Sequence, residues 1–280
     1  MKSMMRKLTA TMATIGLVST LGTAVVAGET MDRVMSEGVL KIATDANWPP
    51  MSFLDENGEM DGFDVSVARE VAKRLGVEAE FVTPQWQVIT AGNWNGRWDI
   101  SVGSMTPTTE RARVLSFPGI YYYTPAVFAV HADSDMSSVQ DLNGKVVGAT
   151  QASVYEQYMN KDLVIDAEGV PDFEYLVDAG EVKAYESTTT AMDDIRLGDG
   201  IRVDGIIAGL PTFVVAQENN YPVKVIGDPV FYEPLSVAID KGDQAFHDKI
   251  SGIIADMHAD GTLTALSEEW HGLDYTKAVE

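Results

Sequence analysis

The chain has 280 residues, no cysteine, and 42 acidic against 20 basic side chains, which gives a formal net charge of −22 at pH 7. A surface this acidic is a poor partner for nucleic acid or anionic lipid, and a chain without cysteine has no disulfides and no thiol for lipid attachment. The length is large for one compact core and suits two lobes of ~100–150 residues each.

The first 27 residues are typical of a secretory signal peptide. Basic residues at positions 2, 6 and 7 precede an apolar stretch at 8–22, and Val25 with Ala27 forms a small-residue cleavage pattern. The apolar stretch is too short to anchor the mature chain in a bilayer. We therefore expect residues 1–27 to be cleaved and the remainder to be secreted into a periplasm.

Short β-branched runs then alternate with helical patterns, which is typical of parallel α/β units. Helical spacing of apolar residues in FDVSVAREVAKRL (63–75) predicts a helix that ends at Gly76, and two more helices are expected at about 243–257 and 262–270. Six runs predict strands: VLKIATD (39–45), EAEFVT (78–83), DISVG (99–103), KVVGAT (145–150), DGIIAG (204–209) and VKVIGD (223–228).

The order of these elements predicts an α/β fold in two lobes, each a mainly parallel sheet flanked by helices. The C-terminal part has no strand series of its own and is expected to return to the first half. The chain would then cross twice between the lobes, near 129–134 and 228–234, and two short crossings make a hinge. We predict a first lobe of residues 28–130 plus 232–280, a second lobe of residues 131–231, and a cleft between them.

Ligands of open parallel α/β sheets lie beyond the carboxyl ends of the strands. That rule selects the segments at 44–48, 103–111, 150–153 and 209–211 as candidate sites. Asp204 begins its strand and would lie roughly 16 Å from that edge of the sheet, so it is not a candidate.

Arg111 is the most informative residue of these segments. It follows Gly103, Ser104 and Thr106 at the expected first turn of a helix capped by Thr108. A guanidinium is a forked donor that matches a carboxylate or phosphate, and hydroxyls with free backbone N–H groups complete such an anion site. The alternative is an ordinary helix start in which Arg111 pairs with an acidic neighbour. Its place at a strand end favours the anion site.

Three segments in order carry a resemblance: TDANWPPMSFLDENGEMDGFDVSVAREVAKRLG, VGSMTPTTERARVLSF and ADGTLTALSEEWHG. They resemble the periplasmic solute-binding proteins of polar amino-acid ABC importers, bacterial family 3, and the likeness covers essentially the whole mature chain. The resemblance implies a periplasmic binding protein fold, a clamshell in which a small amino-acid-like zwitterion bridges the lobes. It also implies that the closed form docks on the membrane permease of an ABC transporter. We expect a monomer without cofactor or metal.

The resemblance also assigns roles to residues. The arginine of the family's motif binds the ligand α-carboxylate, and Arg111 matches it. Ser104 and Thr106 stand where the family has hydroxyl and backbone ligands. In the second lobe, Gln151 and Ser153 match a ligand-binding turn loosely, because Ala152 replaces the usual glycine.

Aromatic residues usually form the walls of the side-chain pocket in this family. Trp48 and Trp86 match two such positions, although filling of the core is the alternative for both. Asp45 either accepts a hydrogen bond from a cationic ligand or is a solvated loop carboxylate, and both readings stay open. The remaining tryptophans are assigned to packing: Trp94, Trp98 and Trp270.

One departure from the family pattern concerns the ligand ammonium. The second-lobe strand of the family usually ends in an aspartate that holds this group, and here the position is Gly209. A buried ammonium without its partner costs ~2–5 kcal/mol, a large part of the ~8 kcal/mol of micromolar binding. Three compensations stay open. Asp45 or Glu233 takes the ammonium, or an alkylated nitrogen lies against Trp48 and Trp86, or the ligand has no amine.

Two other functions compete with transport. Cyclohexadienyl dehydratases and some lytic transglycosylases have the same fold, and a dehydratase needs only an acid and a base, for which Glu156 and Glu233 are candidates. The four histidines show no metal spacing, and the chain has no G-x-S-x-G motif and no cysteine. We therefore expect a binding protein rather than an enzyme. A sensory binding protein, which passes its closed state to a receptor, is the other alternative.

Overall fold

The computed structural model describes residues 28–167 and 170–278, so the predicted signal peptide lies outside the described residues. No helix in these two ranges combines the length and the apolar character needed to cross a bilayer. The elements, in chain order, are α1 (Glu29–Glu37), β1 (Val39–Ala43), β2 (Asn47–Trp48), β3 (Ser52–Leu54), β4 (Met60–Asp61), α2 (Phe63–Leu75), β5 (Glu78–Val82), α3 (Trp86–Thr90), β6 (Ile100–Met105), η1 (Arg111–Arg113), β7 (Leu115–His131), η2 (Val139–Leu142), β8 (Val146–Thr150), α4 (Val154–Asn160), β9 (Glu181–Tyr185), α5 (Thr188–Ile195), β10 (Gly205–Gly209), α6 (Leu210–Glu218), β11 (Val223–Asp240), α7 (Gln244–Ala259) and α8 (Thr262–His271).

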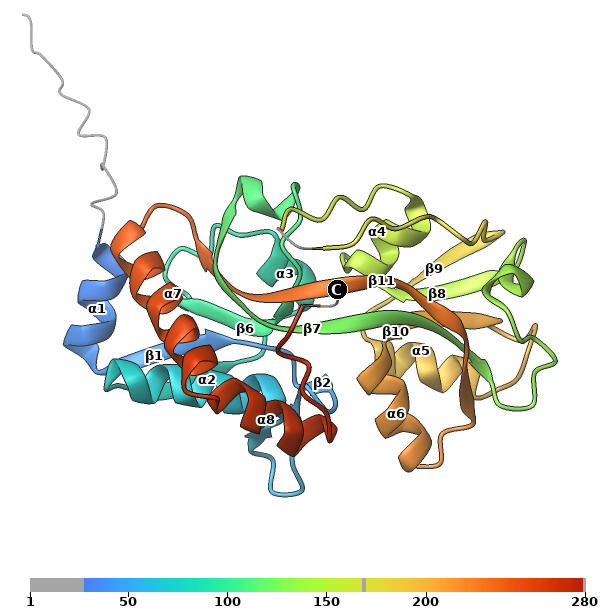
Figure 1. Cartoon of the computed structure of the whole chain (residues 1–280), viewed down its shortest axis with the longest axis horizontal. Helices are drawn as coiled ribbons and strands as arrows, with labels where there is room; N and C mark the ends of the chain where they lie inside the picture. The colour runs from blue at the N-terminus through green and yellow to red at the C-terminus, as the bar shows by residue number, and fades with distance from the viewer. Residues whose placement is uncertain (1–27, 168–169, 279–280) are drawn as a thin grey trace, which may run out of the picture.

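The fold is the predicted two-lobed α/β fold, with helices around each half of the sheet (Figure 1). Strands pair in the order β5-β1-β6-β11-β7-β10-β8-β9. The outer three strands on each side, β5-β1-β6 and β10-β8-β9, pair in parallel. The strands β7 and β11 run antiparallel to each other and to their neighbours β10 and β6. Both sets of parallel strands turn their carboxyl ends toward the middle of the molecule. The strand ends of both lobes therefore lie at the junction between the lobes.

Two long strands connect the lobes, and their length was not predicted. Strand β7 passes from the first core at Tyr122 to the second at Ala126, and β11 returns from Phe231 to Leu235. Within this stretch Thr124 lies opposite Glu233. The crossings are therefore made by two paired strands, where the sequence predicts two short crossings near 129–134 and 228–234.

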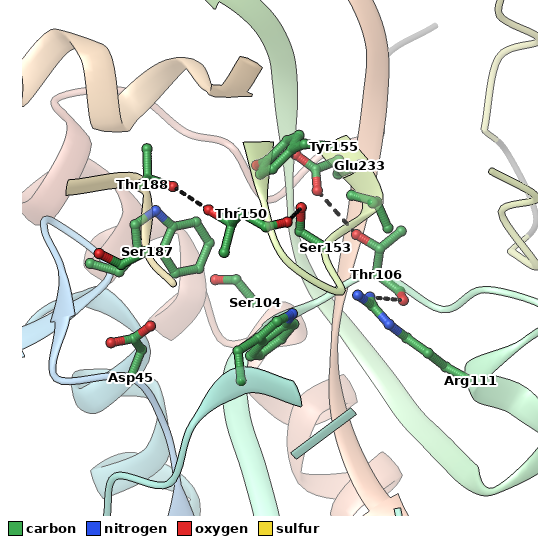
Figure 2. Close-up of a pocket in the computed structure, with 13 residues that line it drawn as sticks. Asp45, Ser104, Thr106, Arg111, Thr150, Ser153, Tyr155, Ser187, Thr188 and Glu233 are labelled. Carbon is green, nitrogen blue, oxygen red and sulfur yellow. Dashed lines mark hydrogen bonds between the residues drawn. The ribbon is translucent and has the colours of Figure 1, made fainter. Parts of the chain in front are cut away.

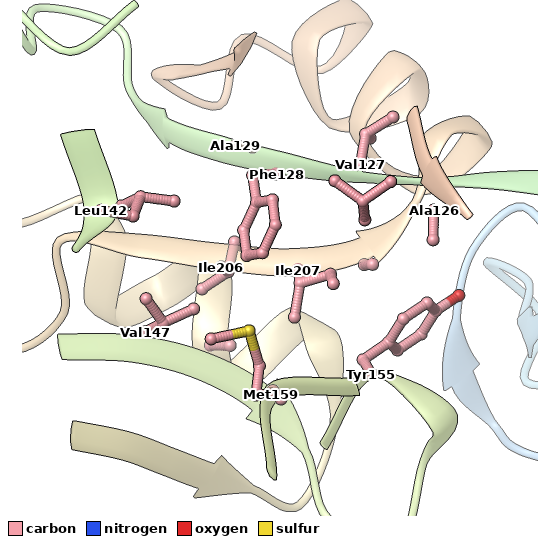
Figure 3. Packing of buried hydrophobic residues seen from close by; sticks show 14 of the residues in the cluster. Ala126, Val127, Phe128, Ala129, Leu142, Val147, Tyr155, Met159, Ile206 and Ile207 are labelled. Atoms are coloured by element: carbon pink, nitrogen blue, oxygen red, sulfur yellow. The ribbon is translucent and has the colours of Figure 1, made fainter. Parts of the chain in front are cut away.

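Each lobe has its own hydrophobic core. The second core holds Phe128, Ile206 and Ile207 between the sheet and its helices, with Tyr155 at the edge (Figure 3). The first core packs α2, α7 and α8 against the sheet, as with Phe63 and Phe246. The division of the chain into lobes stays a prediction, and packing bears only on its first boundary: residues 126–130 belong to the second core, although the sequence assigned them to the first lobe.

Local sequence explains the helices that approach the junction. Gly76, in the left-handed region at φ 77°, ends α2 where the sequence predicts. Ser153 and Ser187 cap α4 and α5, because their hydroxyls accept hydrogen bonds from the backbone N–H groups of the first turn. The predicted strands and helices are present with ends shifted by at most two residues, apart from the extended β11 and the helix expected after Thr108.

Candidate functional site

A cavity lies between the lobes at the carboxyl ends of the parallel strands (Figure 2). Together with the solvent at its opening, it spans about 500 Å³. Side chains from both lobes and from the connecting strand β11 line it: Asp45, Trp48, Trp86, Ser104, Thr106, Arg111, Thr150, Ser153, Val154, Tyr155, Ser187, Thr188 and Glu233. A ligand held here would touch both lobes at once.

Arg111 is a buried cation at one side of this cavity. Its side chain is 4% exposed, and its guanidinium donates to the carbonyl of Thr106 and to the carbonyl of Ala152, both at 2.9 Å. Across the described residues no carboxylate lies within 4 Å of it. Burial lowers the pKa of Arg111 to about 10, against the opposing effect of Glu233, so the group stays charged at neutral pH. A buried cation without an ion pair is suited to a ligand carboxylate.

The backbone around Arg111 differs from the prediction in one respect. Thr108 accepts a hydrogen bond from the backbone N–H of Arg111 at 3.2 Å, as a cap should. The expected helix is however a single 3₁₀ turn, η1, because β7 begins at Leu115 and leaves room for no more.

Ala152 connects the two lobes beside Arg111. Its carbonyl accepts from the Arg111 guanidinium at 2.9 Å and from the indole N–H of Trp86 at 3.2 Å. The Trp86 ring in turn lies 5.4 Å from the guanidinium carbon, a cation–π distance. Ala152 adopts φ 57°, the left-handed conformation that favours glycine.

Ser104 is held by a buried polar network beneath the cavity. Its hydroxyl lies 2.8 Å from Asp64 Oδ2 and 2.6 Å from the Tyr122 hydroxyl, and its backbone N–H donates to the Tyr121 hydroxyl at 2.8 Å. Tyr121 donates to Asp64 at 2.7 Å. Ser104 adopts φ 53°, which an L-residue rarely takes, and these bonds keep it there. Asp64 therefore orients one wall of the cavity without lining it.

The Asp64→Asn variant is expected to lose the pH dependence that this carboxyl gives to stability. Burial raises the pKa of Asp64 from 3.8 to about 7, so the folded chain binds more protons than the unfolded chain between these values. This contribution to stability is full below about pH 4 and is lost as the pH rises through 7. Between pH 5 and 7 the free energy of unfolding of wild type, measured by urea unfolding, should fall by about 2 kcal/mol relative to that of the variant. A difference that stays constant with pH would contradict the assignment.

Glu233 is the second charged group at this side of the cavity. It is 2% exposed and accepts hydrogen bonds from the Tyr155 hydroxyl at 2.7 Å and the Thr106 hydroxyl at 3.1 Å. Burial raises the pKa of Glu233 to about 7, and the hydroxyl donors and Arg111 offset this only in part. A cation brought next to this carboxyl would favour its ionised form.

The far side of the cavity combines an acid, an indole and hydroxyls. The Trp48 indole N–H donates across the lobes to the Thr212 hydroxyl at 3.0 Å. Asp45 is half-buried and accepts from the backbone N–H of Asn47 at 2.7 Å, and burial raises its pKa. On the second lobe Thr188 shares a 3.0 Å hydrogen bond with Thr150 (Figure 2).

The structure brings together most of the residues predicted for the site, and their role in binding stays a prediction. Gly103 lies within β6 without reaching the lining, and Gln151 lies at the surface, where its side chain accepts from Gln87 at 3.1 Å. Gly209 is buried behind Tyr155. The predicted residues that line the cavity are Asp45, Trp48, Trp86, Ser104, Thr106, Arg111 and Ser153.

Four lining residues were missed. Ser187 and Thr188 follow β9, and the rule of strand ends would have selected them had EVKAY been recognised as a strand. Val154 and Tyr155 begin α4 just past the selected segment 150–153. The three tryptophans assigned to packing do pack: Trp94 and Trp98 are buried, and Trp270 lies edge-on to Phe53 with ring centres 6.1 Å apart.

The lobes are closed over the cavity. Outside the cavity lining, the backbone N–H of Thr109 donates to the carbonyl of Val164 at 3.1 Å, and the N–H of Asp166 donates to the carbonyl of Pro107 at 2.9 Å. Gln157 adds a side-chain bond to Glu110 at 2.8 Å. Within residues 28–167 and 170–278 no group of three or more metal-binding side chains occurs. The chemistry offered to a ligand is therefore one buried cation, two acids, hydroxyls and aromatic walls.

A family profile and known relatives match most of the chain. A sequence profile for bacterial extracellular solute-binding proteins, family 3, matches residues 40–273. The probable amino-acid ABC transporter-binding protein of Haemophilus influenzae is 30% identical over 274 residues, 98% of this chain and 100% of the relative. The L-cystine-binding protein TcyJ of Escherichia coli is 29% identical over 250 residues, 88% of each chain.

Comparison with solved structures extends the likeness to the fold. The ancestral amino acid-binding protein AncCDT-1, described as a precursor of cyclohexadienyl dehydratase, matches with a TM-score of 0.74 at 28% sequence identity. The match covers 86% of this chain and 99% of that one. The two-lobed fold thus recurs in a protein described as binding amino acids.

Proposed function

The chain belongs to the bacterial extracellular solute-binding proteins, family 3, and from that premise we propose that it captures a small amino-acid-like zwitterion between its lobes for an ABC importer. The observation that carries the proposal is Arg111, a buried guanidinium that faces a cavity between two lobes and has no carboxylate within 4 Å among the described residues. A ligand carboxylate would satisfy it with charge-assisted hydrogen bonds.

Closure links binding to transport. Because the lining comes from both lobes, a bound ligand stabilises the closed form by the contacts it makes only there. The surface that contacts the membrane permease is then the surface of the closed, ligand-bound form. Relatives over most of this length are named as binding proteins of amino-acid transporters, which supports a permease as the partner.

The setting of the protein follows from the same proposal. Residues 1–27 act as a cleaved signal peptide, and the mature chain works as a monomer in the periplasm. We propose that it binds its solute without catalysing a reaction. Of the two acids considered for dehydration, Glu156 does not line the cavity and instead accepts from the backbone N–H of Ala152 at 2.6 Å. Of those two candidates, only Glu233 lines the cavity.

A ligand panel tests the function. Mature protein, residues 28–280, stripped of ligand, is titrated with the common amino acids and L-cystine, with their carboxamides, and with matching carboxylic acids that lack the amine. A ligand at one hundred times its dissociation constant adds ~2.7 kcal/mol of stability, so the melting temperature should rise by several degrees. Carboxamides should give no shift, because they offer Arg111 no anion.

Two outcomes would contradict this function. Carboxamides that bind as tightly as the free acids would show that Arg111 is not the carboxylate site. Turnover of prephenate by the purified protein would favour the dehydratase alternative. Mass spectrometry of the protein before stripping adds a direct check, since a captured solute should appear in it.

A further inference from the structure

Gly209, at the end of β10, packs against the hydroxyl of Tyr155. A Cβ atom built on Gly209 would lie 3.1 Å from the Tyr155 hydroxyl. This is tighter than ordinary van der Waals contact, so the hydroxyl occupies the space that an acidic side chain at this position would need. That same hydroxyl donates to Glu233 Oε1 at 2.7 Å. Tyr155, which lines the cavity in front of Gly209, therefore presents its hydroxyl to Glu233, an acid that also lines the cavity.

We propose that Glu233, on the connecting strand β11, holds the ligand's ammonium in place of the second-lobe aspartate, and that the solute is an α-amino acid with at least one N–H on its nitrogen. The inference rests on the proposed function and narrows its ligand class. It excludes carboxylates without an amine and zwitterions with a quaternary nitrogen as good ligands.

Thr106 holds Glu233 and Arg111 at the spacing that an ammonium and a carboxylate on one carbon require. Its hydroxyl donates to Glu233 Oε2 at 3.1 Å, and its carbonyl accepts from the Arg111 guanidinium at 2.9 Å. One residue thus contacts both the acid and the cation, which lie on the same side of the cavity (Figure 2). The ammonium and carboxylate of an α-amino acid are borne by a single carbon, so a ligand carboxylate at Arg111 places its nitrogen within reach of Glu233.

The charges around Glu233 favour a cationic partner. The groups that face it are the Arg111 guanidinium from η1 and the hydroxyls of Tyr155 from α4 and Tyr122 from β7. A ligand carboxylate bound to Arg111 would neutralise the cation that the described residues place near Glu233 and leave the buried charge of Glu233 unbalanced. An ammonium restores the balance. Each carboxylate oxygen has accepted one hydroxyl hydrogen bond and retains capacity for another.

Asp45 is the competing acid in the cavity, and its surroundings fit the role less well. It is only half-buried, it accepts from the backbone of Asn47, and it lies across the cavity from Arg111 (Figure 2). A nitrogen on the carbon next to the bound carboxylate would therefore meet Glu233 first. Asp45 is left to contact the side chain of the ligand.

The test counts protons exchanged on binding. The probes are the amino acid with the largest thermal shift, its analogue without the amine and its N-trimethyl derivative, titrated by calorimetry at pH 7 in phosphate and in Tris. Because the pKa of Glu233 is about 7 in the empty cavity, an ammonium should release about half a proton. The analogue without the amine should instead bind weakly with proton uptake. Glu233→Gln should remove the proton exchange and weaken binding of the amino acid at least about 30-fold.

Asp240→Asn serves as the matched control, because burial also raises the pKa of Asp240, and its side chain accepts from the backbone N–H of Trp94 at 2.6 Å without lining the cavity. That variant should keep the proton release. Amino-acid binding by Glu233→Gln within threefold of wild type would overturn the proposal, and so would tight binding of the N-trimethyl derivative. Loss of binding in Asp45→Asn but not in Glu233→Gln would assign the ammonium to Asp45 and also overturn it. If wild type binds no carboxylate at all, the proposed function itself fails.

Discussion

Replacement of Arg111 by methionine is expected to weaken binding of the best amino-acid ligand by at least about 100-fold, the largest loss in the cavity. Methionine fills similar space without charge, so the ligand carboxylate would be buried with no cation opposite it. The fold should survive, because the variant also removes the cost of burying the guanidinium, which makes only backbone hydrogen bonds in the described structure. Calorimetric titration and urea unfolding of the same sample measure the two effects separately.

Two further variants make the Arg111 result specific. Arg113 lies in the same 3₁₀ turn with its side chain exposed and outside the cavity lining, so Arg113→Met should bind within about twofold of wild type. Arg111→Lys keeps the charge but loses the forked geometry, and its affinity should fall between the two. Equal affinities of Arg111→Met and Arg113→Met would show that the cavity binds its ligand without a carboxylate contact.

The sequence predicted the site as far as the rule of strand ends reaches. Apolar, β-branched runs marked the buried parallel strands, and their ends led to Arg111, Ser104 and Ser153. The edge strand β9 was not predicted. Its sequence, EVKAY, contains two charged residues and pairs with β8 alone, so it lacks the apolar run of a buried strand. Ser187 and Thr188, which follow it, were missed for that reason.

Other features depend on tertiary contacts that no local pattern carries. The length of β7 was unpredictable because it is buried in two different cores in succession and shows no alternation of polar and apolar residues. The left-handed backbone of Ser104 is imposed by Tyr121 and Asp64, distant in sequence. Gly209 was recognised as a departure, but only the structure shows that Tyr155 fills the space beside it.

Trp86→Ala is expected to weaken ligand binding by roughly 100-fold. The indole forms a wall of the cavity, lies over Arg111 and donates to the carbonyl of Ala152 in the other lobe, so one substitution removes burial, a cation–π contact and an interlobe hydrogen bond. A desolvated cation–π contact is worth about 2 kcal/mol and a hydrogen bond about 1 kcal/mol, which together give a factor of this size. Calorimetric titration checks the affinity.

Trp86→Phe separates the causes, because it keeps a ring over Arg111 and loses only the N–H donor. Its affinity should fall by about fivefold, the value of one neutral hydrogen bond. The closed form joins the lobes at Ala152, and without ligand the alanine variant should therefore open more readily, which a larger radius of gyration in solution scattering would show. If both variants bind like wild type, Trp86 merely fills space beside the cavity, and closure depends on the backbone bonds at Thr109 and Asp166 instead.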